Sequence, residues 1–158
     1  MPPNGSYVSD IAVDPDSAGN LLVCYSNYSI NSVFFSRDTG NTWYMVGGNI
    51  ESNQNSSGSD PSIRSVEILV DKNGKRHYFA GTSIGLFSTD SLVLGTSNLS
   101  NKTIWKQESP DQIGAAVVTD IKTRNADGYI VVGTHGNGIF DSYYFGNNKP
   151  QAANFGNT

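Results

Sequence analysis

The chain has 158 residues, a formal net charge of −4 and only 15% charged residues, so most of its surface must be polar but uncharged. An acidic chain lacks the basic surface that a phosphate backbone requires, and no apolar run approaches the roughly 20 residues that span a bilayer. We therefore expect no nucleic-acid partner and no membrane partner. Seventeen glycines and many Tyr and Phe residues favour one all-β domain of short strands and tight turns.

The single cysteine, Cys24, lies in the apolar run 21–24, and we interpret it as a buried small side chain. The N-terminal residues show no basic segment followed by an apolar one, so we expect any export signal to lie outside this chain. No spacing of three or four convergent ligands predicts a metal site, and we expect no cofactor.

The first predicted unit covers residues 6–50 and holds four strand-like runs, at 8–15, 21–25, 32–35 and 43–46. The last two flank the sequence SRDTGNTW, in which Ser36, Asp38, Gly40, Thr42 and Trp43 have structural roles. The Asp38 carboxylate can accept N–H groups of its own turn, Gly40 permits a positive φ, and Trp43 can fill an apolar gap. The pattern predicts a tight hairpin.

Two further units follow the first at intervals of about 55 residues. After a predicted loop at 51–61, the second unit covers 62–109 and includes a polar insertion at 91–103. The third covers 114–145 and stops before a fourth strand, and 146–158 has the composition of a tail or linker.

Repeats of four strands at this spacing predict a β-propeller fragment of about three four-stranded antiparallel blades, the last one incomplete. Propellers have about four to eight blades, so three cannot close a ring. We expect missing propeller blades, or self-association, to cover the open sheets.

The SRDTGNTW turn resembles the Asp-box of BNR-repeat propellers, which occur in sialidases, sortilin-type receptors and xyloglucan-degrading glycosidases. The order of the other motifs, ending in VVGTHGNGIF at 131–140, is similar to the last blades of propellers in type IX sorted bacterial proteins. This resemblance implies a secreted or cell-surface protein. It also implies that the ligand binds at the rim formed by the turns between second and third strands. The few arginines of the chain disfavour sialidase activity.

That rim supplies the binding candidates. His135 lies between Thr134 and Gly136 in a predicted second-to-third-strand turn, and Asn137 follows. Tyr25 and Tyr28 lie in the corresponding turn of the first unit, where an aromatic ring could stack on a sugar or could instead pack between blades. We predict a glycan or a protein as the partner.

An acid followed by Ile marks the first strand of each unit, at Asp10, Glu67 and Asp120. If these acids share one position, they form part of a ring near the propeller axis. Paired carboxylates are what glycoside hydrolysis requires, but an acid in every repeat is also explained by a repeated structural role. Our leading hypothesis is a non-enzymatic scaffold or recognition module. The alternative is a fragment of a xyloglucanase-like glycoside hydrolase that uses these carboxylates.

Overall fold

The computed structural model describes residues 5–51, 60–97, 100–144 and 156–157, and all structural statements refer to these residues. This part of the chain forms three antiparallel sheets of four strands each. It includes η1, a single turn of 3-10 helix at Gly48–Glu51, and the described residues contain no helix long and apolar enough to cross a membrane.

The first sheet contains β1 (Val8–Val13), β2 (Leu21–Tyr25), β3 (Val33–Ser36) and β4 (Tyr44–Met45), in that order. The second sheet contains β5 (Ile63–Val70), β6 (Arg76–Thr82), β7 (Gly85–Thr89) and β8 (Lys106–Glu108). Each strand pairs with the next one along the chain, as short turns between β-rich runs require. The strands follow the predicted runs closely, and the all-β fold of repeated four-stranded sheets is confirmed.

The third sheet contains β9 (Val117–Arg124), β10 (Tyr129–His135), β11 (Ile139–Tyr143) and β12 (Gly156–Asn157). β12 lies in the stretch that we predicted to be a tail, and it gives the third sheet the fourth strand that the sequence did not predict. It consists of two residues, Gly and Asn, which both disfavour strands, so it leaves no pattern in the sequence. Residues 145–155, like 52–59 of the predicted loop, lie outside the described part of the chain.

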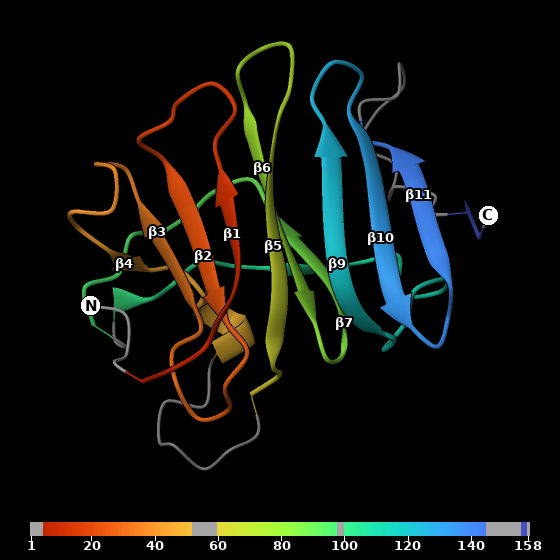
Figure 1. Cartoon of the computed structure of the whole chain (residues 1–158), viewed down its shortest axis with the longest axis horizontal. Helices are drawn as coiled ribbons and strands as arrows, with labels where there is room; N and C mark the ends of the chain where they lie inside the picture. Colours follow the sequence, from red (N-terminus) through yellow and green to blue (C-terminus); the bar gives the residue numbers. More distant parts are fainter. Residues whose placement is uncertain (1–4, 52–59, 98–99, 145–155, 158) are drawn as a thin grey trace.

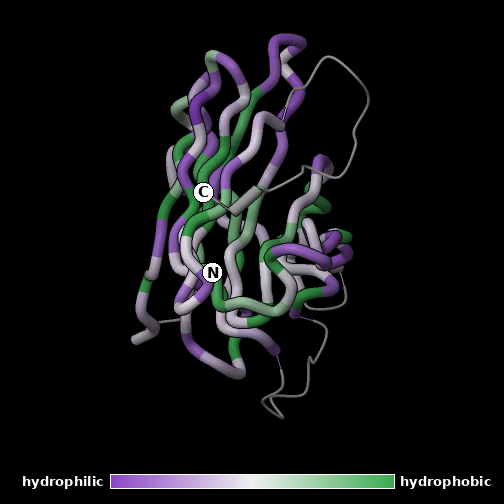
Figure 2. The backbone as a smooth tube through the Cα atoms, turned by 90° about the vertical axis from the view of Figure 1, so that its right-hand side faces the viewer, coloured by the Kyte–Doolittle hydropathy of each residue, from purple (hydrophilic) through white to green (hydrophobic). Residues whose placement is uncertain are grey.

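The sheets lie one after another, with their first strands side by side (Figure 1). β5 contacts both β1 and β9, so the three first strands form the common inner wall. The turns after β1, β5 and β9 lie at the top of Figure 1, and Figure 2 shows that this end of the molecule is hydrophilic. The turns at the bottom of Figure 1, at 26–32, 83–84 and 136–138, together with the strand ends beside them, are called the lower rim below.

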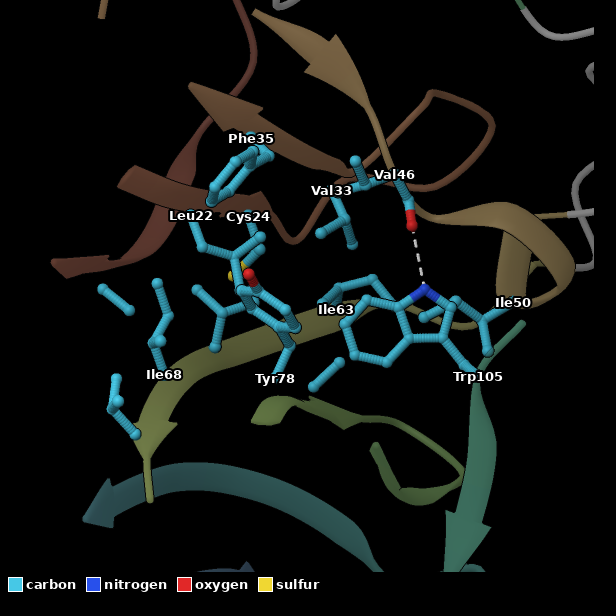
Figure 3. Close-up of a cluster of buried hydrophobic side chains, with 14 residues drawn as sticks. Leu22, Cys24, Val33, Phe35, Val46, Ile50, Ile63, Ile68, Tyr78 and Trp105 are labelled. Atoms are coloured by element: carbon cyan, nitrogen blue, oxygen red, sulfur yellow. Dashed lines mark hydrogen bonds between the residues drawn. The ribbon is translucent and has the colours of Figure 1, made fainter. Parts of the chain in front are cut away.

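Most of the core lies between consecutive sheets, and a smaller cluster of Val23, Tyr25 and Phe34 lies within the first blade. The larger cluster joins the first sheet to β5 and includes Trp105, whose indole N–H donates to the carbonyl of Val46 over 2.9 Å (Figure 3). A second cluster joins the second sheet to β9 and β10. Each sheet buries apolar side chains against the neighbouring sheet, so each interface between two blades is a hydrophobic core.

The insertion at 91–103 extends from the second sheet to the first. Met45 and Gly95 form an antiparallel bridge, with N–H···O distances of 2.8 and 3.0 Å. Asn49 of η1 accepts the N–H of Trp105 at 2.6 Å and donates to its carbonyl at 2.9 Å. The insertion therefore fastens the outer edge of the first blade to the second.

Candidate functional site

The predicted carboxylates come from β1, β5 and β9, which lie side by side. Each of these strands has a β-bulge, and the residue after the bulge is Asp10, Ser65 or Asp120. These three residues pair with Cys24, Gly81 and Gly133 at matching positions of the second strands. Ser65 follows Asp10 by 55 residues, and Asp120 follows Ser65 at the same interval. The equivalent position in the three blades is therefore Asp, Ser, Asp.

The expectation that the three acids share one position is wrong for Glu67. Glu67 pairs with Phe79, two residues further along the sheet than Ser65. The residue of β9 at that level is Lys122, which pairs with Val131. The acid–Ile dipeptide of the second repeat is thus displaced by two residues, and a serine and a lysine that the sequence analysis did not select occupy positions in this site.

Asp10 connects two blades through hydrogen bonds. Its Oδ2 accepts the hydroxyl of Ser65 at 2.7 Å and the N–H of Val66 at 3.2 Å, while Oδ1 accepts the N–H of Ile11 at 2.9 Å. The Ser65 Oγ in turn accepts the N–H of Ile121 at 3.1 Å. We call this series of bonds the inner-strand relay. It provides acceptors for N–H groups of β5 and β9 that have no acceptor within their own sheets, because both are edge strands.

Glu67 and Lys122 lie two residues further along their strands than Ser65 and Asp120, and their charges interact with the acids of the site. Burial raises the pKa of Glu67, and the Asp10 and Asp120 carboxylates act in the same direction, although the N–H of Ile68 and the charge of Lys122 oppose them. The Lys122 ammonium lies 3.0 Å from Asp120 Oδ1. Partial burial works against charge on Lys122, but its bond to Asp120 and the nearby acids raise its pKa overall. The cluster thus holds its lysine charged among three carboxyl groups.

The lower rim carries the predicted binding residues of the third blade. His135 and Asn137 are exposed, and Thr134 bonds within its own turn, where its Oγ1 donates to the Gly138 carbonyl at 2.7 Å. Gly136 and Gly138 have φ values of 88° and 80°, so this turn needs residues without a Cβ. The turn presents an imidazole and an amide to solvent.

The first blade contributes one of its two predicted aromatic residues to this rim. Tyr28 is exposed in the β2–β3 turn, whereas Tyr25 is buried and its ring packs edge-on against Phe34 at 5.9 Å between centroids. Tyr25 is thus buried within the first blade, where it packs against residues of its own sheet, and it cannot present its ring for stacking on a sugar. Ile84 is exposed on the same rim in the second blade, which separates Tyr28 from His135.

The SRDTGNTW turn lies between β3 and β4. Asp38 Oδ1 accepts the N–H of Thr42 and the hydroxyl of Ser36, both at 2.8 Å, and the Ser36 Oγ accepts the N–H of Gly40 at 2.9 Å. The bonds from Thr42 and Ser36 lower the pKa of Asp38. Gly40 has a φ of 86°, and a Cβ there would lie 3.5 Å from the Trp43 ring. The oxygens of Asp38 serve the turn itself.

A buried carboxyl group that the sequence did not indicate lies beneath the first blade. Glu51, in η1, accepts the N–H groups of Ser32 and Val33 through Oε1, and Asn101 donates to its Oε2 at 3.4 Å. Burial raises the pKa of Glu51 to about 7. A single acid at the start of a polar loop gives no sequence signal of burial.

The chain is similar in structure to known β-propeller proteins. The β-propeller domain of Cps50 (Swd1) from Myceliophteria thermophila is similar with a TM-score of 0.59 and 10% identity, over 94% of this chain and 44% of that one. YCF48 from Cyanidioschyzon merolae has a TM-score of 0.56 and 14% identity, over 98% and 41%. The GH74 enzyme of Niastella koreensis has a TM-score of 0.52 and 18% identity, over 86% and 21%.

These similarities show the fold: the three sheets are blades of a β-propeller. The chain spans less than half the length of each of these three structures. No protein-family model matches the sequence, and no curated protein matches it. At identities below 20%, these similarities show the fold of the chain but say nothing about its activity.

Proposed function

We propose that this chain is a non-enzymatic scaffold and recognition module, the blades of a secreted or cell-surface β-propeller that binds a glycan through the lower rim. The observation that carries the proposal is that Asp10 joins two blades through hydrogen bonds. Its carboxylate accepts three hydrogen bonds, two of them from the neighbouring blade. The Asp10 carboxylate therefore has a structural role, and the exposed chemistry lies at the rim.

The rim favours a neutral glycan. Its exposed polar groups include the phenol of Tyr28, the imidazole of His135 and the amide of Asn137, and none of these three is permanently charged. Hydroxyl-rich sugars are bound by such hydrogen-bonding groups together with an exposed aromatic ring. Localisation outside the cell rests on the resemblance to exported propellers, and a chain whose single cysteine is buried agrees with it.

Binding of xyloglucan oligosaccharides, measured by isothermal titration calorimetry, tests the proposal. We expect binding that weakens at least about tenfold in the double variant Tyr28→Ala/His135→Ala, since both side chains are on the rim. The matched control is Tyr44→Ala, a tyrosine in β4 that lies beside the SRDTGNTW turn. No glycan binding, together with capture of a protein through the same residues, would instead establish a protein partner.

One observation favours the alternative, a glycoside hydrolase fragment. Glu67 has a raised pKa and lies within the electrostatic reach of Asp10 and Asp120, as a general acid near a second carboxylate would. Release of reducing sugar from xyloglucan by the wild type, lost in Glu67→Gln with glycan binding retained, would replace the scaffold proposal with this one. Equal activity in both proteins, at the level of buffer, would exclude it for this chain.

A further inference from the structure

One face of β1 is exposed although the equivalent faces of β5 and β9 are buried. Val8, Ile11 and Val13 are 49%, 58% and 53% exposed. Their counterparts in β5, by the bulge register described above, are Ile63, Val66 and Ile68, which are 0% to 1% exposed. In β9 the counterparts of the first two, Val118 and Ile121, are 0% exposed. The repeat therefore predicts a covering blade that β1 lacks within the described residues.

The contacts of the buried counterparts show what such a covering blade must provide. Ile63 and Ile68 pack against apolar residues of the preceding sheet, among them Leu22, Val33 and Phe35 (Figure 3), and Val66 belongs to the same cluster. Val118 and Ile121 pack against Leu69, Phe79 and Leu86 of their own preceding sheet. In both interfaces, the inner strand of one blade lies on the second and third strands of the blade before it.

The third blade presents the complementary half of this interface to solvent. Ile139 corresponds to Val33 and Leu86, because all three pair with equivalent residues of their second strands. Val33 and Leu86 are fully buried, whereas Ile139 is 52% exposed. Asp120 holds the position from which Asp10 and Ser65 accept an N–H of the following blade. The chain therefore carries both halves of one interface, at opposite ends of its row of blades.

We propose that the exposed face of β1 docks on the third blade of a second copy of this chain. Asp120 of one copy accepts the Ile11 N–H of the other, as Ser65 accepts that of Ile121, and Ile139 covers Ile11. A second copy supplies a matching partner, because Asp120 and Ile139 continue an interface that already exists twice within the chain. Two copies related by a twofold axis then close six blades, within the range of about four to eight that propellers adopt.

Light scattering of the purified chain tests this proposal, with circular dichroism to verify the fold of every variant. The wild type is expected at twice 17.0 kDa. Ile11→Asp and Ile139→Asp should each abolish the dimer, because a carboxylate would be buried without a partner. Ile104→Asp is the matched control, since Ile104 is 62% exposed and lies outside both faces. It should remain dimeric.

A mixing experiment distinguishes this arrangement from others. In an equimolar mixture of Ile11→Asp and Ile139→Asp chains, one interface of each mixed pair contains both substitutions and the other contains neither. Dimers should therefore reappear in the mixture. A monomeric wild type, a dimer that survives either substitution, or a mixture that stays monomeric would each overturn the proposal.

Discussion

Glu51 should make the stability of this protein fall as the pH rises through the weakly acidic range. Its carboxyl is buried beneath the first blade, and burial raises its pKa from 4.5 to about 7. Between these two values the folded chain keeps a proton that the unfolded chain has lost. Folding therefore takes up a proton there, and the free energy of unfolding decreases with increasing pH until Glu51 is ionised in both states.

The size of the effect follows from the shift in pKa. Each unit corresponds to about 1.4 kcal/mol, so the full change is about 3 kcal/mol between about pH 4.5 and pH 7. The hydrogen bonds from Ser32 and Val33 persist in both forms, because Oε1 accepts them whether or not Oε2 carries the proton. The decrease in the free energy of unfolding at higher pH is therefore the cost of burying a charge. The backbone hydrogen bonds are kept.

Urea denaturation at about pH 5 and about pH 8, for wild type and Glu51→Gln, measures it. The amide is neutral at both pH values, so the difference in unfolding free energy between the two proteins should shift by about 3 kcal/mol in favour of the variant at the higher pH. The exposed acid Asp111 provides the control, and Asp111→Asn should follow the wild-type profile. A difference that stays constant, or that shifts in favour of the wild type, would refute the burial argument.

Three other substitutions test the packing between blades. Trp105→Phe removes the bond to the Val46 carbonyl and part of a buried ring, and should lower the unfolding free energy in urea by about 2 to 3 kcal/mol. Ser65→Ala interrupts the inner-strand relay and should cost about 1 to 3 kcal/mol, with faster amide exchange at Ile121, whose N–H would keep only its bond to the Asp120 carboxylate; unchanged exchange would contradict the relay. Gly48→Ala should lower the melting temperature, since its Cβ would meet the Thr103 carbonyl at 1.8 Å and φ is +53°; an unaltered melting temperature would contradict this contact.

The repeat was readable from the sequence because each unit carries its own strands and turns. The β-rich runs and the Gly-rich turns between them are local signals, and the four runs predicted for the first unit coincide with β1 to β4. The twelfth, β12, is held by pairing with β11 and has no propensity of its own. Local pattern therefore predicted the blades but not the edge of the last one.

The candidate site could be predicted only in part from the sequence, because the three repeats were aligned by their acid–Ile pairs. Acid–Ile pairs aligned Glu67 with Asp10, whereas the bulges align Ser65 with it. A constant interval of 55 residues, together with the Gly–Thr pairs that end β6 and recur in β10, was the better signal. The burial of Glu51 could not be inferred at all, because it is created by contacts with residues 18 to 50 positions away.

The bridge between Met45 and Gly95 has a consequence for the behaviour of the protein in concentrated solution. β4 is the outermost strand of the first blade, and the free backbone of such a strand is a template on which other chains can assemble into β-aggregates. The insertion of the second blade takes up part of that template within the same molecule. A chain with this insertion shortened would keep its blades, but the backbone of β4 would be free to pair with other chains. Fibrils nucleated at β4 would be the expected result.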